Sequence, residues 1–446
     1  MPPDKVHARL REVAAPAMKG SLPTVVLAGC GYGAIDALRA LKGQARVIAI
    51  NPHPYIVNSG MSTRLLSGRF SLDLVRIPLL EHIQANGAQF LQGRVTHIYP
   101  QAQTLTLEGA GGIQTLAYDY LLVNVGRELR AIDGMQHAFA IRPAEQLVAA
   151  QTWIRQCWQR AAQGDPTPSL LTFGVVGGGC TGTELMGELY DLCREMSAAT
   201  GIPLARARLL LIHGQAHLAE GFSERFRQEV EREIRRLGVE IWAERRVKAF
   251  GPQQVWLEDG SELVAQTRLW AGGLQAPAWL RSCGLPLGPT GSLLVDECLR
   301  VQGAERILAL GDCADFVWGS RLLPKIGVYA VRQGPIAAQN LLRLIRGQPL
   351  LPYRPQATVF VCVTVGNRVA VAEKGRWVWR GYLATLLKNL FDWLYMRQRK
   401  PVRWQVFFYE ISTENGVKIK LQTGRNGLAS SASRSRPYRP SILKSS

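Results

Sequence analysis

The sequence predicts an α/β protein with two parallel-sheet domains, followed by a smaller C-terminal module that contains an amphipathic helix. Two glycine-rich segments, each entered from an apolar strand and followed by a helical segment, are the first evidence for this fold class. A third apolar strand, far downstream, runs into the acidic segment GDCAD. The chain has 446 residues, which is long enough for two domains and an appended module.

The first glycine-rich turn lies in residues 25–38, which read VVLAGCGYGAIDAL. An apolar strand precedes it, the helical segment AIDALRAL follows, and a second strand, RVIAI, completes a βαβ unit of about the usual length of 30 residues. Gly29 and Gly31 allow a tight turn and the close approach of a pyrophosphate. Ala34, after Gly33, substitutes for the third glycine at the contact between helix and strand.

The second turn lies in residues 174–187, GVVGGGCTGTELMG. We expect a strand at 171–176, the turn at 177–182, a helix at 183–199 and a strand at 207–212. Gly177, Gly179 and Gly182 complete the motif without substitution. A lone motif of this kind can reflect packing alone, but two correctly flanked motifs favour two Rossmann-like dinucleotide sites. We interpret them as one site for a tightly held FAD and one for an exchanging nicotinamide nucleotide.

These units divide the chain into consecutive parts. The expected order is a disordered lead-in (1–22), the first part of an FAD-binding domain (23–142), an NAD(P)H-binding domain (143–275), the second part of the FAD domain (276–350), a C-terminal module (351–411) and a disordered basic tail (412–446). Within them we expect a helix at 142–162, a helix at 222–237, a strand at 306–310, and a helix over much of 328–346 that is interrupted or begun at Pro335.

Charge and cysteine spacing limit the partners. The formal net charge is +19, from 53 Lys and Arg against 34 Asp and Glu, which favours anionic partners: phosphate-bearing cofactors, a lipid surface or nucleic acid. No aromatic-interleaved RNA motif is present, so we expect no nucleic acid. The eight cysteines form no C-x-x-C or C-x4-C pair. We therefore expect no metal, and a reducing compartment such as the cytoplasm or an organelle interior.

Three segments resemble one enzyme family. VVGGGCTGTELMGEL, RLWAGG and ILALGDCADF are similar to the two-dinucleotide flavoproteins of the pyridine nucleotide-disulfide oxidoreductase superfamily, and within it to type II NADH dehydrogenases. PYIVNSGM (54–61), LPKIGVYAVRQGP (323–335) and GRWVWR (375–380) resemble the flavoprotein module found fused to selenide, water dikinase. The resemblance covers about 22–411.

The resemblance implies an FAD-dependent NAD(P)H:quinone oxidoreductase that does not pump protons. Hydride would pass from NADH or NADPH to FAD, and the electrons would then pass to a quinone. The alternative is the same first step with another acceptor, namely a sulfur or selenium compound or a protein.

The resemblance also implies which residues contact FAD. Asp312 would hydrogen-bond the ribityl or pyrophosphate region, and Lys325 would stabilise the anionic reduced flavin near N1. The alternatives are a helix N-cap for Asp312 and an ordinary surface position for Lys325. Asn51 stands where an Asp or Glu usually binds the adenosine ribose. The full predicted FAD set is Gly29, Gly31, Gly33, Ala34, Asn51, Met61, Val95, Gly126, Asp312 and Lys325.

The nicotinamide nucleotide would lie on the second turn. Glu184 would position the nicotinamide against the flavin; its alternative role is an acid near a helix N-terminus that complements the dipole. The next strand ends at His213, without the acid expected for NADH, while Arg206 and Arg208 are close in sequence, so NADH and NADPH both stay open. The predicted set is Gly177, Gly179, Gly182, Glu184, His213, Gly272 and Gly273.

The segment that would line the quinone site departs from the pattern of the family. Type II dehydrogenases carry an AQ-x-A-x-Q segment that lines the quinone site, and here Val328 and Arg332 replace its two glutamines while Gln333 follows. We predict Glu184, Lys325 and Gln333 as the catalytic residues. Cys157 and Cys362 are compared with the cysteines of sulfide:quinone reductases, but their sequence surroundings do not match. Electrons are therefore expected to leave the flavin directly.

The segment 380–396 is predicted to form the amphipathic helix. Its apolar residues lie at 382, 383, 386, 387, 390, 391, 394 and 395, Lys388 and Asp392 lie opposite, and the basic segment RQRK follows at 397–400. Such a helix can lie on a membrane surface, which predicts a peripheral membrane enzyme. The alternative is that the stripe packs against the two main domains or against a second subunit in a homodimer.

Overall fold

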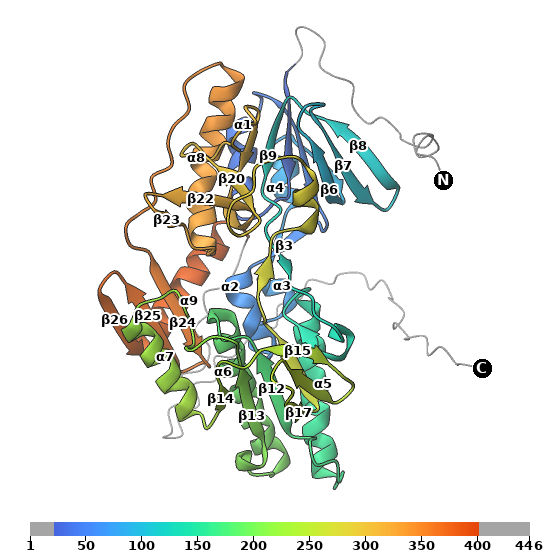
Figure 1. Cartoon of the computed structure of the whole chain (residues 1–446), viewed down its shortest axis with the longest axis vertical. Helices are drawn as coiled ribbons and strands as arrows, with labels where there is room; N and C mark the ends of the chain where they lie inside the picture. Colours follow the sequence, from blue (N-terminus) through green and yellow to red (C-terminus); the bar gives the residue numbers. More distant parts are fainter. Residues whose placement is uncertain (1–21, 401–446) are drawn as a thin grey trace, which may run out of the picture. The chain divides into compact units, whose positions relative to one another are not determined.

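The computed structural model describes residues 22–400 (Figure 1). The predicted disorder of 1–21 and of the tail 412–446, and the end of the C-terminal module at 401–411, lie outside the described residues.

The first domain is built on a parallel sheet whose strand order is β21-β9-β1-β2-β5. Its strands are β1 (Thr24–Ala28), β2 (Arg46–Asn51), β5 (Gln89–Gln92), β9 (Tyr120–Val123) and β21 (Ile307–Ala309). Strand β1 is fully buried, as its apolar sequence requires. Strand β21 pairs with β9 although nearly two hundred residues separate them, so the first domain is completed by chain that follows the second domain.

The second domain has its own parallel sheet, in the order β11-β18-β12-β13-β14. Its strands are β11 (Phe139–Ala140), β12 (Thr172–Val176), β13 (Arg208–Ile212), β14 (Glu240–Trp242) and β18 (Thr267–Trp270), and its helices are α5 (Glu145–Ala162), α6 (Cys180–Thr200) and α7 (Glu224–Arg236). The two parallel sheets, each with its glycine turn after a central strand, confirm the predicted fold class.

Smaller elements complete the two domains. The helices are α1 (Ala34–Leu41), α2 (Ser59–Ser62), α3 (Leu72–Val75), α4 (Leu80–Ala85) and α8 (Gly327–Ile345), with a 3-10 turn at Thr63–Leu65. The strands are β3 (Tyr55–Val57), β4 (Arg76–Pro78), β6 (Arg94–Tyr99), β7 (Thr104–Gly109), β8 (Gly112–Ala117), β15 (Val247–Phe250), β16 (Gln254–Leu257), β17 (Glu262–Val264), β20 (Leu293–Val295), β22 (Ala314–Trp318) and β23 (Arg321–Leu322). The short strands β10 (Glu128–Leu129) and β19 (Leu274–Gln275) pair where the chain crosses between the domains.

Two helices differ from their predicted limits. Helix α6 begins at Cys180 rather than at 183, because Gly179 of the turn is itself the residue that precedes the helix. Helix α8 runs through Pro335 as one element, so the expected interruption or start at this proline is wrong. A proline removes one backbone donor from a helix, and here the remaining hydrogen bonds are sufficient to continue it.

The C-terminal module is an antiparallel sheet followed by one helix. Strands β24 (Phe360–Val365), β25 (Val369–Lys374) and β26 (Trp377–Gly381) lead into α9 (Tyr382–Arg397). The module is joined to the second domain by charge: Arg380 lies 3.1 Å from a carboxylate oxygen of Glu229 and 2.6 Å from one of Glu233, both on α7.

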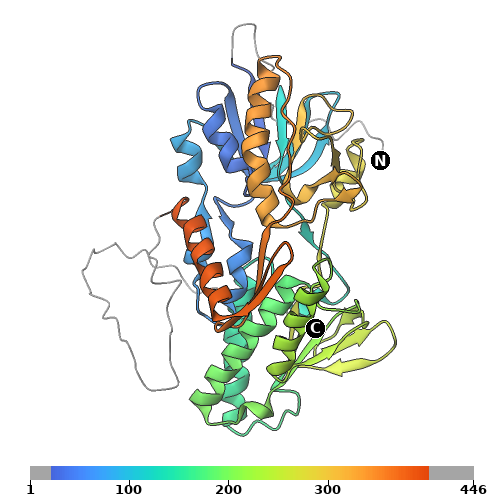
Figure 2. The same cartoon turned by 90° about the vertical axis from the view of Figure 1, so that its left-hand side faces the viewer.

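Helix α9 directs its polar side inward and much of its apolar stripe outward. The side chains of Lys388 and Asp392 are only 12% and 13% exposed. In contrast, Leu383 is 64% exposed and Phe391 is 49% exposed, and Leu390 and Leu394 are also exposed. Figure 2 shows α9 in orange-red, beside the β24–β26 sheet. These four residues leave much of the stripe uncovered, whereas Tyr395 of the same stripe contacts Tyr32 of the first domain edge to face, with ring centroids 5.6 Å apart. The alternative that the stripe packs against the main domains therefore holds for only part of it. Between residues 22 and 400, no helix is long and apolar enough to cross a bilayer.

Candidate functional site

The first glycine turn lies at the carboxyl end of β1, against the end of the neighbouring strand β9. Gly29 has a φ of +84°, and a Cβ there would lie 2.6 Å from the backbone oxygen of Asn124. A Cβ on Gly31 would lie 2.6 Å from the side-chain oxygen of Asn124. That oxygen is buried and has no hydrogen-bond partner among the described residues. A buried acceptor without a donor suits a ligand rich in hydroxyl groups, such as the sugar chain of FAD.

The start of α1 packs tightly against α8. A Cβ on Gly33 would lie 2.8 Å from the backbone oxygen of Ala330 and 3.3 Å from the Cα of Gly334. Gly33 and Gly334 thus allow two helices to meet backbone to backbone, and the buried Ala34 follows at the first position of α1. The predicted role of this segment in cofactor binding is therefore accompanied by a clear packing role.

Asn51, at the carboxyl end of β2, uses its side chain to hold the turn. Its side-chain oxygen accepts a hydrogen bond from the backbone N–H of Cys30 at 3.2 Å, and its amide nitrogen donates to the carbonyl oxygen of His53 at 2.8 Å. The side chain is buried, so a role as ribose ligand stays a prediction that requires one of these bonds to be shared or exchanged.

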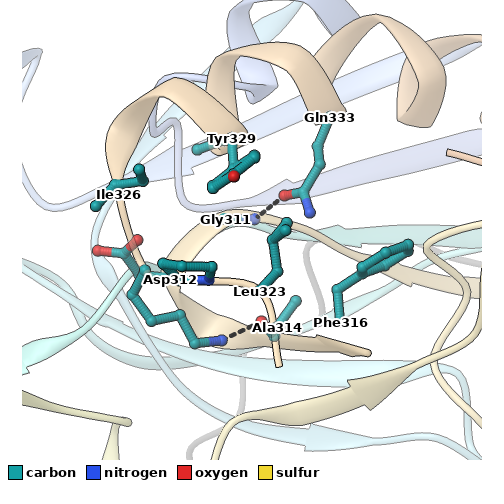
Figure 3. Close-up of a pocket in the computed structure, with 11 residues that line it drawn as sticks. Gly311, Asp312, Ala314, Phe316, Leu323, Ile326, Tyr329 and Gln333 are labelled. Atoms are coloured by element: carbon teal, nitrogen blue, oxygen red, sulfur yellow. Dashed lines mark hydrogen bonds between the residues drawn. The ribbon is translucent and has the colours of Figure 1, made fainter. Parts of the chain in front are cut away.

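A pocket follows β21, at the same edge of the sheet. It is lined by the GDCAD segment and the start of α8, including Asp312, Lys325, Tyr329 and Gln333. Figure 3 shows Gln333 reaching from α8 toward Gly311, and its side-chain oxygen accepts the backbone N–H of Gly311 at 2.8 Å. Gln333 is almost fully buried. The structure thus places it where it fixes the turn that carries Asp312.

Lys325 lines this pocket, but its ammonium group already has protein partners. It lies 2.7 Å from a carboxylate oxygen of Asp315, which is fully buried, and it also donates to the carbonyl oxygen of Ala314. Asp315 further accepts hydrogen bonds from the backbone and hydroxyl groups of Thr290. The alternative of an ordinary surface position for Lys325 is therefore wrong: the side chain is 14% exposed and belongs to a buried ion pair.

The second glycine turn follows β12. A Cβ on Gly182 would collide with the backbone oxygen of Gly177, so this position needs glycine for packing. Gly179 differs, because a Cβ there would meet no heavy atom within 4 Å. Gly272 lies against the ring of Trp270, while Gly273 has a φ of +107° and open space beside its Cα. The turn is therefore open on the side of Gly179, where a nucleotide diphosphate would approach.

His213 lies directly behind this turn. It is 4% exposed, and a Cβ on Gly178 would lie 2.6 Å from the Cγ of its ring. Both ring nitrogens lack a hydrogen-bond partner among the described residues. Burial lowers the pKa of His213, so the neutral ring is favoured. The end of β13 therefore presents an uncharged ring where many dinucleotide sites have a carboxylate.

Glu184 faces the C-terminal module. Because α6 begins at Cys180, Glu184 lies in its second turn and is 7% exposed, so the role of a first-turn acid that complements the dipole is not supported. Its carboxylate accepts from the backbone N–H and the hydroxyl of Thr364, both at 3.4 Å. Burial raises the pKa of Glu184, while the charges of Lys388 and Arg64 oppose this shift.

Charged residues on the buried side of α9 lie near the carboxyl group of Glu184. Arg64, which is 2% exposed, lies 3.2 Å from Asp392, and Lys388 donates to both oxygens of Asp392 at 3.0 Å. Lys388 also donates to the carbonyl oxygen of Gly60, next to Met61. The polar side of α9 is therefore buried because it completes an ion-pair cluster between Arg64 of the first domain and the C-terminal module, close to Glu184 of the second domain.

The three remaining predicted FAD contacts lie around the first sheet. Met61 is fully buried, and its sulfur accepts a hydrogen bond from the side chain of Asn58, which also contacts Met396 of α9. Val95 lies in β6 with its side chain in the core. Gly126 has a φ of +71° and follows β9 with open space around it. Their contacts with FAD stay predictions.

The comparisons with known proteins agree with this geometry. A family model described as pyridine nucleotide-disulphide oxidoreductase matches residues 23–334. The chain belongs to this family. It is 25% identical over 341 residues to a type II NADH:quinone oxidoreductase of Staphylococcus aureus, a match that covers 73% of this chain and 83% of the relative. The predicted superfamily is thus confirmed, while the narrower resemblance to the module fused to selenide, water dikinase stays a prediction.

Solved structures share the fold. NDH2 from Plasmodium falciparum in complex with NADH superposes with a TM-score of 0.73 at 15% identity, covering 86% of this chain and 96% of that one. The sulfide:quinone oxidoreductase of Aquifex aeolicus gives 0.69 at 20% identity, covering 88% and 93%. As a pyridine nucleotide-disulphide oxidoreductase with two Rossmann-like domains, the chain is an oxidoreductase.

The two cysteines that were compared with those of sulfide:quinone reductases, Cys157 and Cys362, lie in different parts of the structure. Cys157 is buried in α5, where it is an electrostatic neighbour of Cys193, whereas Cys362 lies on β24 near the α9 charge cluster. All eight cysteines are free thiols. Burial raises the pKa of Cys362 to about 12, which keeps it a thiol at neutral pH. Within residues 22–400, no cluster of His, Cys, Asp and Glu could hold a metal ion.

Asp191, on α6, gives a prediction for the pH dependence of stability. Burial, with repulsion from Glu188, raises its pKa from 3.8 to about 6. The folded protein therefore holds this proton more tightly than the unfolded chain, so stability is lost as pH rises from about 4 to about 6. We expect Asp191→Asn to remove this loss, and urea unfolding of both proteins at pH 4, 5, 6 and 7 measures it. Parallel pH profiles would contradict the assignment.

Proposed function

We propose that the chain is an FAD-dependent NAD(P)H:quinone oxidoreductase of the type II kind, with FAD on the first turn and NADH or NADPH on the second. The observation that carries this proposal is the pair of glycine turns, each with buried polar atoms beside it that lack a hydrogen-bond partner among the described residues. These atoms are the side-chain oxygen of Asn124 at the first turn and the ring nitrogens of His213 at the second. The relatives named type II NADH:quinone oxidoreductase support quinone as the acceptor.

FAD supplies the two-electron chemistry when it is bound. The residues of the chain would bind the cofactor and fix its orientation. Asp312 and Asn124 lie at the carboxyl ends of neighbouring strands, where they could bind the ribityl hydroxyl groups. Lys325 would present N–H donors near the flavin, but its ion pair with Asp315 cancels its net charge. Its effect on the flavin is therefore a directed hydrogen bond rather than a free positive charge.

Glu184 and Gln333 would take different roles. Burial raises the pKa of Glu184, so this group holds a proton more readily than an exposed glutamate would, beside the turn where the nicotinamide is proposed to bind. Gln333 is bonded to Gly311, so we assign it as a positioning residue for the turn that carries Asp312 rather than as a contact for the quinone.

The test is anaerobic stopped-flow reduction of the flavin by NADH and by NADPH, followed by mixing with a soluble quinone analogue. Rapid bleaching and then rapid recovery of the flavin absorbance would support the proposal. Purified protein without flavin would refute the first half. Recovery with polysulfide or a selenium compound but not with quinone would refute the second half in favour of the alternative acceptor.

The exposed apolar stripe of α9 supports attachment to a membrane surface. Leu383, Leu390, Phe391 and Leu394 are exposed on one helix, and Arg397, at its end, lies on the exposed side. An exposed apolar helix face followed by basic residues suits an interface with anionic lipids, and such attachment would bring the enzyme to the membrane in which a lipid-soluble quinone dissolves.

We expect the double variant Leu390→Glu and Leu394→Glu to bind anionic phospholipid vesicles at least 10-fold more weakly than wild type, because each carboxylate removes apolar contact and repels the surface. Both side chains are exposed, so folding and flavin content are expected to be unchanged. Ile113→Glu, at another exposed apolar residue on β8, is the matched control. If the double variant instead converts a homodimer to a monomer without changing vesicle binding, a second copy covers the stripe.

A further inference from the structure

We propose that the second nucleotide site selects NADPH over NADH, and that Arg246 binds the 2′-phosphate of its adenosine. The inference rests on the proposed function only in that a nicotinamide nucleotide binds the second turn. It goes beyond that function by naming the reductant and the residue that distinguishes it.

The first step is the absence of a carboxylate at the end of β13. Sites for NADH usually place an Asp or Glu there, because a carboxylate accepts hydrogen bonds from the ribose hydroxyl groups and repels a 2′-phosphate. Here the position is His213, followed by Gly214. The neighbouring strand β14 runs parallel to β13 and ends at Trp242, so the segment after β14 reaches the same edge of the sheet.

The second step is that His213 needs a partner. Its ring is buried against Gly178 of the turn, and no side chain or backbone group of the described residues forms a hydrogen bond of normal geometry with either ring nitrogen. The backbone of Gln215 is close enough only to raise the pKa of the ring somewhat, against the larger lowering by burial. An unpaired buried polar group costs free energy, which a ligand with acceptor oxygens would recover. A 2′-phosphate offers three acceptor oxygens, one of which can accept the single N–H of the neutral ring, while the other ring nitrogen is itself an acceptor and gains no partner from it.

The third step is an arginine without an ion pair among the described residues, beside Gly214, the residue that follows His213. A Cβ on Gly214 would lie 2.5 Å from the Cγ of Arg246, so the stem of this arginine crosses the residue that follows His213. Arg246 is exposed and makes no ion pair in the part of the chain described. Its neighbour Arg245 is occupied, since it donates to Asp259 at 2.9 Å. Arg246 is therefore available for a phosphate.

The positions of Arg206 and Arg208 also favour Arg246 as the residue that binds the 2′-phosphate. Arg208 is the first residue of β13, so it lies at the opposite end of the strand from His213, and it is paired with Glu240 at 2.7 Å. Arg206 precedes that strand. The two arginines that the sequence suggested for NADPH are thus at the wrong edge of the sheet. Of the acids that influence His213 electrostatically, Glu231 is paired with Arg235, and Glu220 lies exposed in the loop.

The experiment measures binding of 2′,5′-ADP and of 5′-AMP to the FAD-loaded protein by isothermal titration calorimetry. The two probes differ only in the 2′-phosphate. Wild type is expected to bind 2′,5′-ADP at least 10-fold more tightly. Arg246→Ala should lose about 10- to 100-fold of that affinity, the range for a charged hydrogen bond, and keep its affinity for 5′-AMP. Arg208→Ala, the matched control, should bind both probes as wild type does.

A variant at His213 tests the proposed preference for NADPH over NADH. His213→Glu should restore the carboxylate and lower the ratio of kcat/KM for NADPH over NADH in flavin reduction by at least 10-fold. Equal affinity of wild type for the two probes, or equal weakening of both in Arg246→Ala, would overturn the inference. Neither probe requires an electron acceptor. If 2′,5′-ADP binds through Arg246 while no quinone is reduced, only the proposed acceptor fails.

Discussion

Gly29→Ala is expected to yield a destabilised protein that is purified without most of its FAD. Two effects act together at this position. The φ of +84° costs any other residue about 1–2 kcal/mol. In addition, the new Cβ would lie 2.6 Å from the backbone oxygen of Asn124 and 2.7 Å from the Cα of Val125, so β1 and β9 must separate at the point where the turn begins.

The matched control for this prediction is Gly43→Ala. Gly43 also has a positive φ, +70°, but a Cβ there would meet no atom within 4 Å. This variant therefore measures the backbone cost alone, about 1–2 kcal/mol, and should retain its FAD. Urea unfolding and the ratio of flavin to protein absorbance measure both variants. We expect Gly29→Ala to be about 2 kcal/mol less stable than Gly43→Ala, the usual cost of overpacking. Equal stability and equal flavin content would show that the first turn does not depend on this close approach.

The glycine turns were predictable because their signal is local. Each consists of a buried strand, a fixed glycine spacing and a helical segment that are consecutive in sequence, so the position of both turns and the α/β class follow without knowledge of long-range contacts. The start of α6 was predicted three residues late because the turn and the helix share Gly179, and residue patterns alone do not separate a cap from the loop before it.

The residues missed by the sequence are those brought in by strand order. Asn124 contacts the first turn only because β9 pairs with β1, and Arg246 lies beside Gly214, next to His213, only because β14 pairs with β13. The one available signal was that Asn124 directly follows an apolar strand, at the end of a strand where ligand contacts collect in parallel sheets. Arg206 and Arg208 show the opposite error, since closeness in sequence placed them near a site that lies at the other end of their strand.

The direction of α9 could not be predicted from its pattern. The sequence shows an apolar stripe and an opposite polar side, and the general expectation is that the stripe faces the protein. Here the buried Arg64 lies beneath the helix and needs a counter-charge, so Asp392 and Lys388 turn inward and the apolar residues turn outward. Arg64 comes from a segment more than three hundred residues earlier, and no local pattern links the two.

Gly179→Ala is expected to leave folding and FAD binding unchanged and to lower kcat/KM for the reducing nucleotide by about 100-fold. Gly179 has a φ of −75°, which any residue can adopt, and its Cβ would meet no protein atom within 4 Å. Among residues 22–400 nothing lies in the path of this methyl group, so what it is expected to obstruct is a molecule bound over the turn. Moving a diphosphate away from the N-terminus of α6 forfeits hydrogen bonds between backbone N–H groups and charged oxygens, each worth about 1.5–3 kcal/mol.

Gly182→Ala, three residues later, provides the contrast. Its Cβ would collide with the backbone oxygen of Gly177, so this variant should lose stability whether or not a nucleotide is present. Thermal unfolding of the FAD-loaded proteins, without and with added nucleotide, separates the two cases. Added nucleotide should stabilise wild type but not Gly179→Ala, although the two proteins unfold at the same temperature without it. If nucleotide stabilises Gly179→Ala as much as wild type, the diphosphate does not lie on this turn. The glycine motif of the second domain would then not mark a nucleotide site.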